Sequence, residues 1–172
     1  GFFNIIDLAN SFKVPHFLYA SSSSVYGDNL KLPFKEENNT DKPRQIYAAT
    51  KKSNELMSYS YSKIYKMNIV GLRFLTVYGP YGRPDMTPFR FIKNFYNDLP
   101  IKVFNHGKHK RDFTYIDDAI NSVINLFLIL TKKQNKSFFE IYNIAKGKSE
   151  KLNDYIKFLE KEISSKFKKI YL

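Results

Sequence analysis

The chain has 172 residues, of which 43% are hydrophobic and 17% aromatic, a composition that suffices for one sizeable globular core. It carries a net charge of +12 and contains no cysteine, which excludes disulfides and thiolate metal sites. The sequence holds no nucleic-acid-binding signature and no apolar stretch long enough to cross a bilayer, so we expect neither a nucleic acid nor a membrane as a partner.

The first half of the chain alternates between helical and strand patterns. Apolar residues at helical spacing predict a helix over residues 2–12, and an apolar run predicts a buried strand over residues 16–21. Residues 28–45 are polar and include two prolines, so we expect a long loop there. A helix over residues 45–66 and a strand over residues 68–75 follow.

The second half begins with residues 76–85, where two glycines and two prolines predict an irregular loop that lines a site. The elements expected after it are, in chain order, a helix over 88–97, strands over 101–104 and 112–115, a helix over 117–131, a strand over 138–144 and a helix over 151–167. Strands that alternate with helices predict an α/β protein with a mainly parallel sheet.

Tyr47 and Lys51 lie four residues apart in the second predicted helix, so they share one helix face and the ammonium can lie beside the phenol. A free tyrosine has a pKa of about 10, and a nearby cation favours its phenolate. The serine run 21–24 ends a predicted strand, at the edge where open α/β sheets bind ligands. A serine hydroxyl there can bridge the tyrosine to a substrate hydroxyl. These groups can take a proton from an alcohol while a cofactor takes a hydride.

The spacing is a weak signal without this context. The chain has 13 Tyr, and Tyr59/Lys63 and Tyr142/Lys146 repeat the same interval. Those two pairs fit a tyrosine and a lysine on a solvated helix face. The serine run upstream distinguishes the first pair from them.

Three longer segments accompany this pair: Tyr-Ala-Ala-Thr-Lys-Lys-Ser-Asn-Glu-Leu-Met over residues 47–57, Gly-Leu-Arg-Phe-Leu-Thr-Val-Tyr-Gly-Pro-Tyr-Gly-Arg-Pro-Asp-Met over 71–86, and Arg-Asp-Phe-Thr-Tyr-Ile-Asp-Asp over 111–118. In this order they resemble the extended short-chain dehydrogenase/reductase family, the NAD-dependent nucleotide-sugar epimerases and dehydratases. The resemblance runs from Gly1 to Leu172, and it is greatest to the members that act on UDP-glucuronate.

The resemblance implies a Rossmann-like parallel sheet and part of a smaller α/β substrate domain. Residues 1–80 are then the C-terminal part of the NAD-binding domain. Residues 81–172 mostly bind the nucleotide sugar, and the chain crosses back to the first domain within them. The glycine-rich phosphate-binding turn of the family has no counterpart here, so we expect these residues to be a fragment of a longer enzyme.

The resemblance also implies the roles of individual residues. The family's catalytic triad corresponds to Ser22, which holds the sugar C4 hydroxyl, Tyr47, the acid/base, and Lys51, which also binds the nicotinamide ribose. Val77 is a further cofactor contact. The expected substrate contacts are Ser23, Ser24, Thr76, Arg83, Val103, Phe104, Asn105 and Arg111.

Five of these contacts have a particular expected partner. A guanidinium fork fits a carboxylate, so Arg83 is a candidate for the C6 carboxylate of a uronic acid. Arg111 corresponds to the family's diphosphate-binding arginine, although it could instead pair with the neighbouring Asp112. Residues 103–105 correspond to the segment that flanks uracil. Thr76 could equally be a β-branched residue that ends a strand, and Ser23 and Ser24 could serve backbone groups.

The residues after Ser22 favour one reaction within the family. The related 4,6-dehydratases carry Thr-Asp-Glu at positions 22–24, and their two carboxyls perform the elimination. This chain has serine at positions 23 and 24, which favours epimerisation at C4 through a 4-keto sugar. The resemblance implies that the reaction converts UDP-glucuronate to UDP-galacturonate. The alternatives are a 4-epimerase of UDP-hexoses or UDP-N-acetylhexosamines, and a non-catalytic fragment.

We expect a cytoplasmic enzyme that forms a homodimer through the two helices beside the site, as members of this family commonly do. His106 and His109 are close in the sequence but have no evident third ligand, so we expect no metal site.

Overall fold

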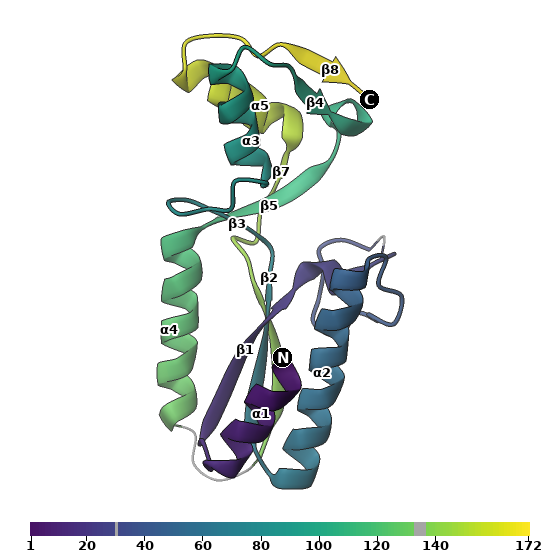
Figure 1. Cartoon of the computed structure of the whole chain (residues 1–172), viewed down its shortest axis with the longest axis vertical. Coiled ribbons are helices and arrows are strands. Elements are labelled where there is room, and N and C mark those ends of the chain that lie inside the picture. Colours follow the sequence, from purple (N-terminus) through teal and green to yellow (C-terminus); the bar gives the residue numbers. More distant parts are fainter. Residues whose placement is uncertain (30, 133–136) are drawn as a thin grey trace. The chain divides into compact units, whose positions relative to one another are not determined.

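The computed structural model describes residues 1–29, 31–132 and 137–172, so Leu30 of the expected long loop lies outside the described residues. The described residues form two compact units (Figure 1). The first unit comprises Gly1–Leu75 and Ile120–Ile144, and the second comprises Thr76–Ala119 and Ala145–Leu172. The second unit begins at Thr76, before the expected boundary at residue 81, because residues 76–78 pair with a strand of that unit.

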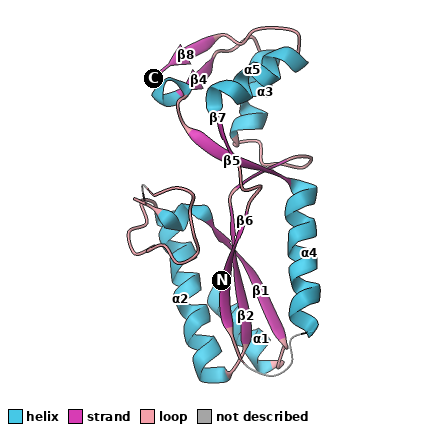
Figure 2. Ribbon diagram, turned by 180° about the vertical axis from the view of Figure 1, so that it is seen from behind, coloured by secondary structure: helices cyan, strands magenta, loops and turns pink. Residues whose placement is uncertain are grey.

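A parallel sheet forms the centre of the first unit. Its strands are β1 (His16–Ser22), β2 (Asn68–Phe74) and β6 (Phe139–Ile144), in the order β1-β2-β6 (Figure 2). The register pairs His16 with Asn68 and Ile69 with Phe139, and both pairings are parallel. The predicted α/β class with parallel strands is therefore confirmed.

Helices α1 (Phe2–Ser11) and α2 (Ile46–Tyr65) pack together and lie beside this sheet, while α4 (Ile116–Lys132) is drawn on the side opposite α2 in both views (Figures 1 and 2). β1 contributes the alternate residues Phe17 and Tyr19 to the core beside α1, because successive strand side chains point to opposite faces. The buried cluster consists of Ile6, Ala9, Tyr19, Met67 and Ile69.

Small side chains allow α2 to approach the sheet closely. Ala48, Ser58 and Ser62 are buried on the inner face of α2. Within β2, Gly71 lies against the Tyr19 ring, and a Cβ at this position would stand 2.7 Å from the Tyr19 hydroxyl oxygen. Position 71 therefore requires glycine for close approach.

The second unit contains two small sheets. In the first, β3 (Thr76–Tyr78) pairs in parallel with β5 (Lys110–Tyr115), which pairs antiparallel with β7 (Ser149–Lys151). In the second, β4 (Ile101–Val103) pairs in parallel with β8 (Lys169–Tyr171). Helices α3 (Thr87–Tyr96) and α5 (Leu152–Glu162) complete the unit. Its core consists of Phe91, Ile101, Val103, Ile156 and Phe167.

Two sequence predictions are corrected in this unit. Residues 76–85 were expected to be irregular throughout, but they begin with β3, which β5 stabilises by pairing. The last helix was expected to run to residue 167, but it ends at Glu162, and Ser164 has a φ of 50°. The helix ends there because the Glu160 carboxylate accepts a hydrogen bond from the Phe167 N–H at 3.0 Å and pairs with Lys169 at 2.7 Å, which turns the chain back into β8.

Within the described residues, no helix is both long enough and apolar enough to span a membrane. The same part of the chain holds no group of three or more His, Cys, Asp or Glu side chains arranged for a metal ion.

Candidate active site

Ser22 lies where β1 ends and the short 3-10 helix η1 (Ser23–Tyr26) begins. Its backbone is extended, and its Oγ accepts hydrogen bonds from the Ser24 N–H at 3.2 Å and from the Ser24 hydroxyl at 2.9 Å. These two donors engage the lone pairs of the Ser22 oxygen, so the hydroxyl can donate its own hydrogen to a ligand oxygen. Ser24 therefore orients Ser22, and the local turn fixes the position of that hydroxyl.

Tyr47 and Lys51 lie in the first turns of α2. The Lys51 Nζ stands 5.7 Å from the centroid of the Tyr47 ring, within cation–π range. The same ammonium donates a hydrogen bond of 2.8 Å to the carbonyl oxygen of Ala20, two residues before Ser22 in β1. Tyr47 is 52% exposed, so its ring is accessible to a ligand.

The second pair at the same interval on α2 has a similar geometry, since the Lys63 Nζ stands 5.3 Å from the centroid of the Tyr59 ring. The stacking of lysine on tyrosine therefore does not by itself mark a site. The bond from Lys51 to Ala20 distinguishes the first pair, because it ties the start of α2 to the carboxyl end of β1.

A buried ion pair lies one helical turn beyond Lys51. Glu55 of α2 and Arg73 of β2 are each 2% exposed. The Arg73 Nε and Nη2 donate to the two carboxylate oxygens of Glu55, both at 2.9 Å, and the Ser21 hydroxyl donates to Glu55 Oε1 at 2.7 Å. Burial alone would lower the pKa of Arg73, but its hydrogen bonds with Glu55 and Tyr26 raise that pKa above the ordinary value, so the guanidinium stays charged.

Arg73 also contacts the segment that follows the serine turn. Its guanidinium carbon lies 4.8 Å from the centroid of the Tyr26 ring, and its Nη1 donates to the Glu36 carbonyl oxygen at 3.2 Å. The Tyr26 ring stacks on Phe34 with centroids 4.4 Å apart, and its hydroxyl donates to Asn143 Oδ1 at 2.7 Å. Burial raises the pKa of the Tyr26 hydroxyl.

Sequence reasoning did not identify Glu55, Arg73, Tyr26 or Asn143. One signal was present: Arg73 is a charged residue inside the otherwise apolar run Ile69 to Phe74, and a buried charge requires a partner.

The second unit contains a cavity of about 460 Å³. Three of the residues expected to bind substrate line it, namely Thr76, Phe104 and Arg111. The other lining residues are Met86, Thr87, Arg90, Phe91, Asn94, Pro100, Lys102, His109, Phe113 and Leu152. Within the described residues no acidic side chain lines this cavity, so it combines cationic and aromatic groups, a combination suited to a phosphorylated ligand with a planar base.

Arg90, Lys102 and His109 are cavity residues that sequence reasoning missed. They come from α3, β4 and the segment before β5, and their spacing in the sequence carried no signal. Both carboxylate oxygens of Asp112 accept backbone hydrogen bonds, from the Lys146 N–H at 2.9 Å and the Gly147 N–H at 2.8 Å. Asp112 therefore serves the backbone of the second unit.

The remaining predicted substrate contacts lie outside this cavity. The Val103 side chain is fully buried in the core of the second unit, so only its backbone could meet a ligand. Asn105 is exposed in a left-handed conformation, with φ of 48°. Arg83 forms a bidentate pair with Asp85 in an exposed loop, with distances of 3.0 and 2.6 Å. This pairing with Arg83 holds the pKa of Asp85 below its ordinary value. Val77 lies in β3, partly buried.

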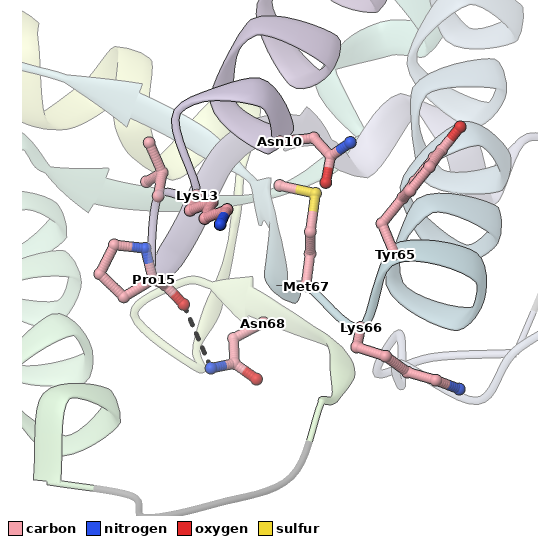
Figure 3. A pocket seen from close by; sticks show the side chains of 8 residues that line it. Asn10, Lys13, Pro15, Tyr65, Lys66, Met67 and Asn68 are labelled. Atoms are coloured by element: carbon pink, nitrogen blue, oxygen red, sulfur yellow. Dashed lines mark hydrogen bonds between the residues drawn. The ribbon is translucent and has the colours of Figure 1, made fainter.

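A smaller cavity of about 260 Å³ lies in the first unit, where α1 leads into β1 and α2 leads into β2 (Figure 3). Figure 3 shows Asn68 hydrogen-bonded to the Pro15 carbonyl oxygen, at 3.1 Å, with Lys13, Lys66 and Met67 nearby. It contains none of the predicted site residues. It adjoins the start of β1, whereas Ser22 is at the end of that strand.

A serine turn at the carboxyl end of a parallel strand, tied to the start of the helix that carries Tyr47 and Lys51, lies where open α/β sheets of nucleotide-binding enzymes hold their ligands. The NAD dependent epimerase/dehydratase family matches residues 1–145, and the chain belongs to this family.

Two named relatives are similar to nearly the whole of this chain. It is 38% identical to the probable UDP-glucuronate 4-epimerase of Rhizobium meliloti, over 95% of this chain and 52% of that protein. It is 39% identical to UDP-glucuronate 4-epimerase 4 of Arabidopsis thaliana, over 98% of this chain and 41% of that protein. The chain thus spans about half the length of the curated relatives it matches.

Two solved structures of nucleotide-sugar epimerases are similar to this chain in fold. The UDP-glucuronic acid 4-epimerase from Bacillus cereus, in complex with UDP-glucuronic acid and NAD, matches with a TM-score of 0.86 and 34% identity, over 96% of this chain and 51% of that one. A UDP-N-acetylglucosamine 4-epimerase from Methanobrevibacter ruminantium matches with a TM-score of 0.84 and 25% identity, over 99% of this chain and 54% of that one. The first unit therefore has the Rossmann-like fold expected from the sequence.

Proposed function

We propose that these residues carry the catalytic triad and part of the substrate site of an NAD-dependent nucleotide-sugar 4-epimerase that acts on UDP-glucuronate. The observation that carries the proposal is the bond from Lys51 to Ala20, which joins the start of the Tyr47 helix to the strand that ends in Ser22. The identity to UDP-glucuronate 4-epimerases supports the same choice.

In the proposed reaction, the three residues of the triad act first in the oxidation of the sugar at C4 and again in the reduction that follows. The Tyr47 phenolate accepts the proton of the sugar C4 hydroxyl, Lys51 stabilises that phenolate, and the Ser22 hydroxyl donates a hydrogen bond to the C4 oxygen. NAD, when bound, supplies a site that takes the C4 hydride and returns it. Loss of the proton and the hydride leaves a 4-keto sugar, and their return to the opposite face of C4 gives the epimer without net oxidation.

The residues after Ser22 support epimerisation over elimination. Position 23 and position 24 carry hydroxyls, and the Ser24 hydroxyl is engaged with Ser22. Elimination needs an acid and a base beside the leaving group, and two carboxyls perform that work in the dehydratases. Ser23 and Ser24 offer neither, so oxidation at C4 followed by reduction is the reaction that fits.

The cavity of the second unit fits the nucleotide part of the substrate. Arg111, Arg90 and Lys102 supply cations for a diphosphate, and Phe104 supplies an aromatic face for uracil. Arg83 is the proposed partner of the C6 carboxylate. Because the Asp85 carboxylate already accepts both hydrogen bonds from the Arg83 guanidinium, the substrate carboxylate must displace Asp85 to bind Arg83.

Tyr47, Lys51 and Val77 are the residues proposed to contact NAD. An ammonium held at the carboxyl end of a parallel strand suits a ribose hydroxyl, so the residues present fit the nicotinamide end of the cofactor. The glycine-rich turn that would hold the pyrophosphate is not among these 172 residues. A homodimer through the two helices beside the site, of which α2 is one, and a cytoplasmic location remain part of the proposal.

The second candidate is a 4-epimerase of UDP-N-acetylhexosamines or neutral UDP-hexoses. The fold match to the Methanobrevibacter ruminantium enzyme favours it. An exposed Arg83 already paired with Asp85 is also compatible with a substrate that has no carboxylate.

The test is an NMR assay of 4-epimer formation by the protein expressed from the complete reading frame that contains these residues, with NAD. We expect conversion of UDP-glucuronate to UDP-galacturonate and much slower conversion of UDP-glucose. A preference for UDP-N-acetylglucosamine would establish the second candidate. Binding of nucleotide sugar without conversion of any substrate would show that the triad is not catalytic.

A further inference from the structure

Two buried charges lie beside the triad and have no part in the reaction described above. Glu55 follows Lys51 by four residues on α2, and Arg73 lies in the middle strand of the first unit. Both side chains are almost fully buried and hydrogen-bonded to each other. A buried ion pair next to a reactive helix can act on the reaction without touching a substrate.

We propose that Glu55 and Arg73 are positioning residues, which fix α2 and the serine turn relative to each other so that Tyr47 and Lys51 face Ser22. This inference rests on the proposed function, because it assigns Glu55 and Arg73 to the triad described there.

The contacts of Arg73 reach each segment that builds the triad. Nε and Nη2 bind the carboxylate of Glu55 and thereby hold α2. Glu55 Oε1 also accepts a hydrogen bond from the hydroxyl of Ser21, which precedes Ser22 in β1. The guanidinium face covers the Tyr26 ring at the end of the serine turn. One side chain of β2 therefore joins the helix, the strand end and the turn.

The geometry requires the planar fork of arginine. Two parallel N–H groups meet two carboxylate oxygens, the third nitrogen donates to the Glu36 carbonyl, and the plane stacks on Tyr26. A lysine ammonium is a point charge that cannot make the bidentate contact and the stacking together. The arrangement thus fixes orientation as well as charge.

Stability by itself does not account for the pair. Removing two charges from water costs about as much free energy as their attraction returns, and a well-packed apolar pair is often as stable or more stable. A buried ion pair with this many directed hydrogen bonds instead selects one arrangement of the segments around it. The Lys51 bond to Ala20 anchors the first turns of α2, and Glu55 anchors the turn after it.

The test replaces the ion pair by an apolar pair, in the double variant Glu55→Leu/Arg73→Met. We expect the variant to fold, with a urea midpoint somewhat below the wild-type value, because the buried Ser21 hydroxyl loses its acceptor. The NMR signals of the Tyr47 ring and the Ser22 side chain should shift or broaden. In the protein from the complete reading frame, kcat for UDP-glucuronate should fall by about 100-fold with KM little changed, as a displaced catalytic group predicts.

A matched control removes the ion pair between the buried Glu160 and Lys169, in Glu160→Leu/Lys169→Met of the second unit, and should leave the Tyr47 and Ser22 signals unchanged. Wild-type signals and kcat in the Glu55/Arg73 double variant would overturn the proposal. If that variant does not fold, Arg73→Lys, which keeps the charge, should show the same shifts, and unchanged signals there would also overturn it. Absence of turnover in the wild type would refute the proposed function, while the NMR comparison would still decide the positioning role.

Discussion

At the scale of single residues, the contacts of a side chain distinguish a candidate site residue better than its spacing in the sequence does. Tyr47/Lys51 and Tyr59/Lys63 have the same interval on the same helix, and both lysines stack on their tyrosine. Only the first lysine is described with a bond to β1, at Ala20. The two pairs therefore provide the proposed reactive pair and an internal control on the same helix.

Tyr47→Phe should reduce kcat for UDP-glucuronate by about 10²–10⁴-fold, because it removes the general acid/base and leaves the ring in place. Tyr59→Phe is the matched control and should retain wild-type turnover. The measurement is steady-state kinetics on the protein from the complete reading frame, with circular dichroism to verify the fold. Comparable kcat values for the two variants would refute the role of Tyr47.

Arg90→Met should weaken the binding of UDP to the 172-residue chain, because it removes a cation from the cavity of the second unit. Lys93→Met is the matched control, since Lys93 lies on the same helix, is exposed and does not line the cavity. Titration calorimetry at two salt concentrations measures the effect. Equal losses in both variants would mean that UDP responds only to the general positive charge of the chain.

At the scale of secondary-structure elements, the contact between β1 and β2 depends on a glycine. The Tyr19 ring lies over Gly71, and its hydroxyl is buried near that of Ser58, but no hydrogen bond of ordinary geometry joins the two. Burial raises the pKa of this hydroxyl above its ordinary value, which keeps it neutral. The strand pair thus combines a close approach with an unsatisfied polar group.

Gly71→Ala should lower the free energy of unfolding by about 1–3 kcal/mol, because its Cβ would overlap the Tyr19 hydroxyl. Tyr19→Phe should be nearly neutral or stabilising by itself, since it removes an unpaired buried oxygen. Combined with Gly71→Ala it should recover part of the loss, a non-additive result that urea unfolding of the four proteins would reveal. Strict additivity would show that the two groups do not meet.

At the scale of the whole molecule, the chain builds two units from alternating stretches, and each unit has its own core. In the second unit, Glu160 of α5 binds Phe167 and Lys169, which lie after the helix and lead into β8. Burial would raise the pKa of Glu160, but hydrogen bonds from Lys169, the Phe167 N–H and Lys166 lower it below its ordinary value of 4.5. The folded state therefore binds the ionised carboxylate in preference to the protonated one.

This depressed pKa predicts the pH dependence of the second unit. A carboxyl with a lowered folded pKa stabilises the fold above its unfolded pKa, and that contribution is lost as pH falls through the folded value. Wild type should therefore exceed Glu160→Gln in stability at pH 7, and the difference should shrink below pH 4.5. Urea unfolding across this range, followed by the fluorine signal of fluorotyrosine at Tyr155 in α5, measures it. A difference that grows on acidification would contradict the assignment.

The sequence by itself determined the succession of helices and strands, the parallel class, the family and the candidates Ser22, Tyr47 and Lys51, because periodicity and short motifs are local properties. The C-terminal end of the last helix and the strands β3, β7 and β8 were not predicted, since Glu160 and strand pairing determine them through residues remote in the sequence. The Glu55–Arg73 pair and the cationic cavity were decided by the tertiary structure. Buried charges and cavity walls come from segments remote in sequence, which only packing brings into contact.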